Sequence, residues 1–127
     1  YGYYRDTTPF LKSLYDAGRL RRVDFATSTC AESNCGIIST LSSKHLRRQL
    51  PEAFKLNDLL ADQGYGTYFI LSGSHDWRDL RQLYGGGQTL YFDGQESAQF
   101  NRADDRVIFE GLSRVPDRET PAFFLIH

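Results

Sequence analysis

Residues 27–41 contain the side chains whose types and spacing are best suited to chemistry. Small hydroxyl and thiol residues run there into a helical pattern of apolar residues that includes Ile37 and Leu41. The thiol of Cys30 would then lie near a helix N-terminus, where unpaired N–H groups and the helix dipole favour anions and lower the pKa of a thiol. This predicts a nucleophile for phosphate or sulfate esters. The same stretch also fits a helix capped by Ser33 with a small buried cysteine.

A second polar stretch at residues 72–77, with the sequence SGSHDW, follows an apolar segment at residues 67–71. We expect the apolar segment to be a buried strand. In open α/β sheets, ligands bind beyond the carboxyl ends of the strands. The loop that contains His75 and Trp77 is therefore the second place where we expect function, although Trp77 also fits a residue packed into the core.

The elements that would position these groups alternate between helices and strands. Pro9 and Gly18 bound the first helix, since proline suits the first helical position and glycine the end. Further helices are expected from the central cluster to residue 42 or 43, at 54–64, at 77–84, and after Asp104 and Asp105 up to 115, with strands at 20–27, 67–71, 90–92 and 122–127. The last strand is apolar without alternation, as in central parallel strands covered on both faces. The sequence predicts an α/β fold with a mainly parallel sheet flanked by helices, part of a larger α/β/α sandwich.

The composition limits the classes of function. The chain has 127 residues, enough for one domain, and a formal net charge of −1, which argues against a nucleic-acid partner. It contains no apolar run long enough to span a bilayer, so we expect it to be soluble. Two cysteines five positions apart do not make a disulfide framework, and their spacing does not place both on one helix face. The patterns at both ends indicate a piece cut from a larger domain.

Three blocks of the sequence, in their order and spacing, resemble the sulfatase-type domain of the alkaline-phosphatase superfamily. They are TPFLKSLYDAG at residues 8–18, CAESN followed by IIST between 30 and 40, and the helix, glycine and strand of residues 54–72. A weaker fourth match covers residues 72–93. The superfamily includes lipoteichoic acid synthases, phosphoethanolamine transferases and sulfatases. The resemblance implies that residues 1–127 are a partial domain of this type, truncated at both ends.

The resemblance also implies roles for single residues. Cys30 takes the place of the nucleophile, which is also a metal ligand in the family, and Asn34 takes the place of an arginine. His75, Trp77 and Arg78 would contact the substrate. The implied cofactor is a divalent metal (Zn, Mn, Mg or Ca) that lowers the pKa of the nucleophile, with its remaining ligands outside this chain. The isolated chain is therefore expected to be inactive.

Departures from the family pattern favour one branch. Glu32 and Asn34 stand where sulfatases that convert cysteine to formylglycine have proline or alanine and arginine. We therefore expect a phosphoglycerol or phosphoethanolamine transferase rather than an arylsulfatase, although transferases of this type use threonine and Thr29 is a fallback nucleophile. The resemblance implies that the binding partner is a phospholipid or a phosphate or sulfate ester substrate. It also implies that the full-length protein is anchored in the cytoplasmic membrane and works at its periplasmic or extracellular face. The alternatives are an arylsulfatase-type hydrolase and a non-catalytic binding domain of the same fold. His127 lies near the start of a family histidine segment.

Overall fold

A three-stranded parallel sheet forms the centre of the molecule in the computed structural model. The structure describes residues 5–28, 30–44, 54–76, 80–84, 86–97, 104–117 and 119–127. The strand order is β2-β1-β3, with β1 at Gly66–Leu71, β2 at Leu90–Asp93 and β3 at Ala122–Ile126. In the register, Tyr68 of β1 lies opposite Leu90 and Phe124. The prediction of an α/β fold with a mainly parallel sheet is confirmed.

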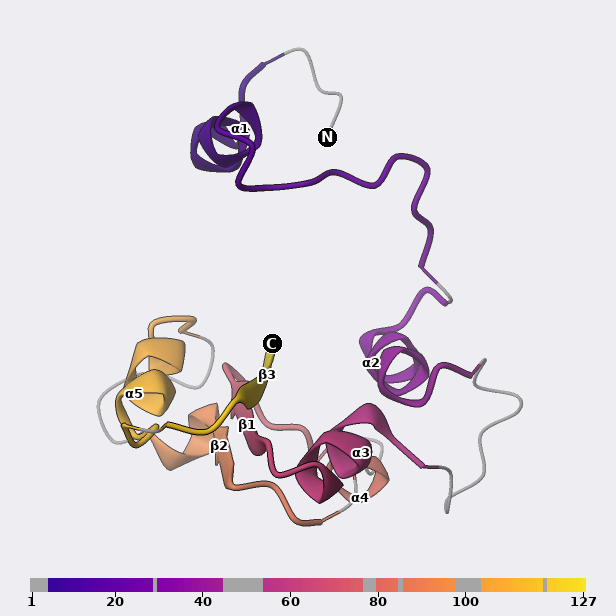
Figure 1. Cartoon of the computed structure of the whole chain (residues 1–127), viewed down its shortest axis with the longest axis vertical. Helices are drawn as coiled ribbons and strands as arrows, with labels where there is room; N and C mark the ends of the chain where they lie inside the picture. The colour runs from indigo at the N-terminus through magenta and orange to yellow at the C-terminus, as the bar shows by residue number, and fades with distance from the viewer. Residues whose placement is uncertain are drawn as a thin grey trace.

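Helices cover both faces of this sheet (Figure 1). On one side lie α2 (Ser33–Ser42), α3 (Leu56–Asp62) and α4 (Leu80–Leu83), and on the other lies α5 (Val107–Ser113). The helix α1 (Pro9–Asp16) lies apart from the sheet. None of the helices in the described parts of the chain combines the length and apolar character needed to cross a bilayer.

Alternating side chains of the strands divide the core into two clusters. Phe69 points toward the first cluster, which contains Ile38 and Leu41 of α2, Leu80 of α4, and Tyr84. The adjacent residues of the strands face the second cluster, which contains Ile70, Phe92 and Val107. Because consecutive residues of a strand point to opposite faces, a strand buried on both faces is apolar throughout. The first cluster ties α2, which carries the predicted nucleophile segment, to the same face as α4.

Proline and glycine mark the helix ends as predicted. α1 begins at Pro9, and Gly18 adopts a φ of +69°, which suits glycine better than a residue with a side chain. Gly64, with a φ of +83°, follows α3 in the same way. α2 ends at Ser42, also as predicted, but Ser33 is its first helical residue and Glu32 takes the N-cap position. The expected start of a helix at residues 77–79 lies outside the described residues.

The predicted strand at residues 20–27 is wrong. The segment pairs with no described strand, and Phe25 is fully exposed with a φ of +60°. Residues 20–26 instead line an open groove together with α1, none of whose residues is buried. The last strand was expected to be a buried central strand. In the structure β3 is instead an edge strand of the described sheet, and most of its residues are half-buried.

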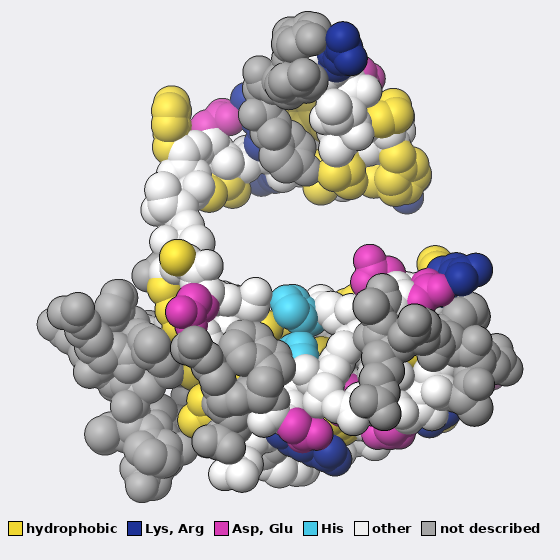
Figure 2. Space-filling model, turned by 180° about the vertical axis from the view of Figure 1, so that it is seen from behind, with side chains coloured by type: hydrophobic (Ala, Val, Ile, Leu, Met, Phe, Trp, Pro, Cys, Tyr) yellow, Lys and Arg dark blue, Asp and Glu magenta, His cyan; other side chains and the backbone are white. Residues whose placement is uncertain are grey.

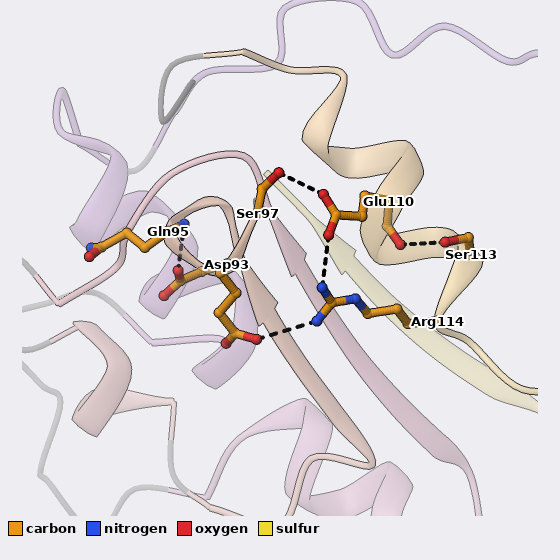
Figure 3. Close-up of polar contacts among 7 residues, drawn as sticks. Asp93, Gln95, Ser97, Glu110, Ser113 and Arg114 are labelled. Atoms are coloured by element: carbon orange, nitrogen blue, oxygen red, sulfur yellow. Dashed lines mark hydrogen bonds and ion pairs between the residues drawn. The ribbon is translucent and has the colours of Figure 1, made fainter. Parts of the chain in front are cut away.

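A polar cluster ties α5 to the turn after β2 (Figure 3). Ser97 donates a hydrogen bond of 2.6 Å to Glu110 Oε2, and Arg114 donates one of 2.8 Å to Glu110 Oε1. Arg114 also forms an ion pair of 3.6 Å with Glu96, and its guanidinium carbon lies 4.4 Å from the ring centroid of Phe92. The hydrogen bond from Ser97, followed by that from Arg114, lowers the pKa of Glu110 from its ordinary value.

This lowered pKa predicts an acid-sensitive contribution to stability. Below pH 4.5, the ordinary pKa, the unfolded state binds a proton at this carboxyl before the folded state does. The free energy of unfolding should therefore fall as the pH drops through the lower, folded pKa. Replacing Glu110 by glutamine should reduce this loss, measured as the urea midpoint between pH 3 and 7. The exposed Glu119→Gln serves as the control, and equal acid slopes in the wild type and Glu110→Gln would contradict the prediction.

Candidate functional site

Two histidines meet at the carboxyl edge of the sheet, one after β1 and one after β3. His75 Nε2 lies 3.0 Å from His127 Nδ1, and the ring centroids are 5.0 Å apart. The backbone of His127 is held by β1, since its N–H donates to the Ile70 carbonyl at 3.2 Å and its carbonyl accepts from the Ser72 N–H at 2.7 Å. Parallel pairing therefore continues past β3 and brings His127 to the loop that holds His75.

A buried tyrosine completes this cluster from the helix side. Tyr84, which follows α4, places its hydroxyl 2.5 Å from His75 Nδ1. Its ring is fully buried and packs edge-on against Phe69, with the centroids 5.2 Å apart. We call Tyr84, His75 and His127 the Tyr–His–His cluster.

Burial keeps two members of the Tyr–His–His cluster uncharged. Desolvation, with a smaller contribution from His127, lowers the pKa of His75 to about 4, and the charge of Asp93 opposes this only in part. Burial also raises the pKa of the Tyr84 hydroxyl well above its ordinary value. At neutral pH the cluster therefore contains a neutral imidazole at His75 and a protonated phenol at Tyr84.

The cluster reaches the molecular surface at one end. His75 is only 3% exposed, whereas His127 is exposed. Figure 2 shows histidine side chains together on the surface of the sheet-containing part of the molecule, below the segment that leads to α1. Asp93, at the end of β2, is buried nearby, and its Oδ1 accepts a hydrogen bond of 2.9 Å from the Gln95 N–H. The arrangement can present one imidazole to a ligand while the other holds it in place.

The two cysteines are bonded to each other. Cys30 and Cys35 form a disulfide with their Cα atoms 6.3 Å apart, within the usual span of such bonds. Only Cys35 lies on α2, whereas Cys30 precedes the helix, so the two cysteines can bond without sharing a helix face. In this form Cys30 has no thiolate, and its predicted roles as nucleophile and metal ligand require reduction.

The other predicted residues are spread over the chain. Asn34 is half-buried in the first turn of α2, and its side-chain oxygen accepts a hydrogen bond of 2.7 Å from the Cys35 N–H. Trp77, Arg78 and the fallback nucleophile Thr29 lie outside the described residues. His75 is the one predicted site residue that the structure places in the Tyr–His–His cluster.

Comparisons with known proteins leave the family open. No family model, curated protein or solved structure matches this chain. The resemblance to the alkaline-phosphatase superfamily therefore stays a prediction.

The described side chains do not provide a metal site by themselves. Within the described ranges, no three His, Cys, Asp or Glu side chains gather as ligands for one ion. The sulfur of Cys30, the predicted ligand, is bonded to Cys35. The metal therefore stays an expectation from the resemblance.

Proposed function

We propose that this chain belongs to a metal-dependent phosphoester or sulfoester transferase or hydrolase, most similar to the phosphoglycerol and phosphoethanolamine transferases. The observation that carries the proposal is the meeting of His75 and His127 at the carboxyl edge of a parallel sheet. Ligands of open α/β sheets bind at this edge, and neutral imidazoles bind phosphoryl and sulfuryl oxygens by hydrogen bonding. The resemblance of residues 8–72 to the sulfatase-type pattern supports the same class.

In this proposal, reduced Cys30 is the nucleophile. An external thiol first reduces the Cys30–Cys35 disulfide by exchange and is itself oxidised. The Cys30 thiolate then attacks phosphorus or sulfur, the bond to the leaving oxygen breaks, and that oxygen takes a proton from water. Water or an acceptor hydroxyl later attacks the ester formed on Cys30, releasing the thiolate again. The substrate would be a phospholipid or a phosphate or sulfate ester, at the outer face of the cytoplasmic membrane.

The disulfide favours a second candidate, a non-catalytic binding domain of the same fold. A cysteine held in a disulfide is not a nucleophile, and the bond ties the segment before α2 to its first turn. In that case Cys30 and Cys35 would stabilise the fold, and reduction would lower stability without producing turnover.

Two cysteine variants separate these candidates. The full-length protein and its variants would be assayed with p-nitrophenyl phosphate, p-nitrophenyl sulfate and a phospholipid donor, with Zn, Mn, Mg or Ca and with or without a thiol reductant. We expect the wild type to need the reductant, and Cys35→Ser to be active without it because Cys30 is then free. Cys30→Ala should lose at least about a thousandfold in kcat, as expected for loss of a nucleophile.

Either of two outcomes would change the assignment. Unchanged turnover in Cys30→Ala would remove Cys30 from the mechanism. Absence of turnover in the reduced wild type with every metal would favour the non-catalytic domain.

A further inference from the structure

The Tyr–His–His cluster determines which nitrogen of His127 carries a proton. We propose that Tyr84 and His75 are positioning residues that hold His127 as an Nε2–H hydrogen-bond donor for an oxyanion, such as a phosphoryl or sulfuryl oxygen. The identity of the ligand rests on the proposed function. The proton arrangement does not, since it follows from the contacts alone.

The hydrogen bond between Tyr84 and His75 has a defined direction. The Tyr84 hydroxyl is buried, and among the described residues its hydrogen-bond partner is His75 Nδ1, at 2.5 Å. A buried O–H without an acceptor costs about 1–3 kcal/mol, so the hydroxyl donates to Nδ1. His75 Nδ1 is then an acceptor without a hydrogen, and the proton of this neutral imidazole is on Nε2.

The position of the proton on His75 determines which nitrogen of His127 accepts a hydrogen bond. His75 Nε2–H lies 3.0 Å from His127 Nδ1, so Nδ1 of His127 accepts. When His127 is neutral, its own proton must be on Nε2. In the described part of the chain no other group bonds to this nitrogen, and the residue is exposed. His127 is thereby a donor at its outer nitrogen, and it cannot accept a proton there.

The N–H group at His127 Nε2 determines which kind of ligand can bind there. A fixed N–H donor at the carboxyl edge of a parallel sheet suits a group with several acceptor oxygens. The donor costs no reorganisation when negative charge develops on such an oxygen, because His75 already holds the His127 ring and the pairing with β1 holds its backbone. The opposite arrangement, with the proton on His127 Nδ1, would make the outer nitrogen a base. The two arrangements therefore predict opposite chemistry.

The test is a ¹⁵N NMR measurement on the histidine side chains of the full chain. In the wild type we expect the shared proton on His75 Nε2, seen by coupling through the hydrogen bond to His127 Nδ1. Inorganic phosphate and sulfate should each shift the His127 Nε2 resonance. In Tyr84→Phe, which keeps the ring packed on Phe69, the coupling should be lost and the phosphate-induced shift should fall at least threefold. Tyr15→Phe, on exposed α1, is the matched control and should behave as the wild type.

Each other outcome overturns part of the proposal. A shared proton on His127 Nδ1, or a Tyr84→Phe spectrum identical to the wild type, would remove the positioning role. The expected coupling without a response to phosphate or sulfate would remove the oxyanion role. The wild-type spectrum decides the proton position even if Tyr84→Phe does not fold. Failure of the Cys30 turnover assay would leave these NMR results unchanged, so the two proposals fail separately.

Discussion

Replacing Phe69 by alanine is expected to lower the free energy of unfolding by about 3–5 kcal/mol. Phe69 is fully buried in the central strand, and its ring contacts Tyr84 and Tyr91, with centroids 5.2 and 6.4 Å away. Helices α2 and α4 pack on the same cluster, so the cavity would lie between rigid elements that relax little. The loss should appear as a lower urea midpoint with an unchanged slope.

An exposed phenylalanine provides the matched control. Phe109 lies on α5 with 72% of its surface exposed, so Phe109→Ala removes the same atoms from water rather than from a core. Phe109→Ala should change the free energy of unfolding by no more than about 0.5 kcal/mol. Equal losses for the two variants would contradict the placement of Phe69 at the centre of the first cluster.

Replacing Gly111 by alanine is expected to destabilise the fold by about 1–3 kcal/mol, although alanine is the better helix former. A Cβ at this position would lie 2.5 Å from Phe92 Cδ1 and 2.6 Å from Ile70 Cγ2. Both neighbours belong to the fully buried second cluster, so they have no space into which to move. Gly111 therefore sets how closely α5 approaches the sheet.

A glycine-to-alanine substitution on α2 should have the opposite effect on the free energy of unfolding. At Gly36 the nearest atom to an added Cβ is Ser28 Oγ at 4.0 Å, which is an ordinary contact. Gly36→Ala should therefore raise the free energy of unfolding by up to about 1 kcal/mol through helix propensity. Thermal unfolding of both variants measures the difference. A stabilised Gly111→Ala would show that α5 does not pack against β1 and β2 as described.

The sequence was sufficient to predict elements whose signals are local. Pro9, Gly18 and Gly64 determine backbone geometry at their own positions, and β1 contains the unbroken run of buried aromatic and aliphatic residues 68–71. The predicted strand at residues 20–27 was wrong because an alternating pattern becomes a strand only when a partner strand is available, and here none is described. The edge position of β3 could not be predicted because helices on both faces make edge and central strands equally apolar.

The site was predictable only in part, since its contacts join distant parts of the chain. His75 was expected from its place after β1, whereas His127 was noted only for lying near the start of a family histidine segment and was not predicted as a site residue. Tyr84 was expected only as part of a helix at residues 77–84, and nothing in that pattern distinguishes a packed tyrosine ring from one whose hydroxyl also reaches a histidine. Predicting the disulfide would have required the exact start of α2, which sequence patterns place only to within a few residues.

The pairing of β3 with β1 also has a consequence for the order of folding. Bonds between β1 and β2 join residues 22 apart, whereas His75 and His127 are 52 apart. Closing the longer loop costs about 0.8 kcal/mol more in chain entropy, so β2 is expected to join β1 before β3 does. The two imidazoles are therefore expected to come into contact only after the β1–β2 pair has formed, and a molecule whose β3 has detached would lose the His75–His127 contact while the β1–β2 pair is still in place.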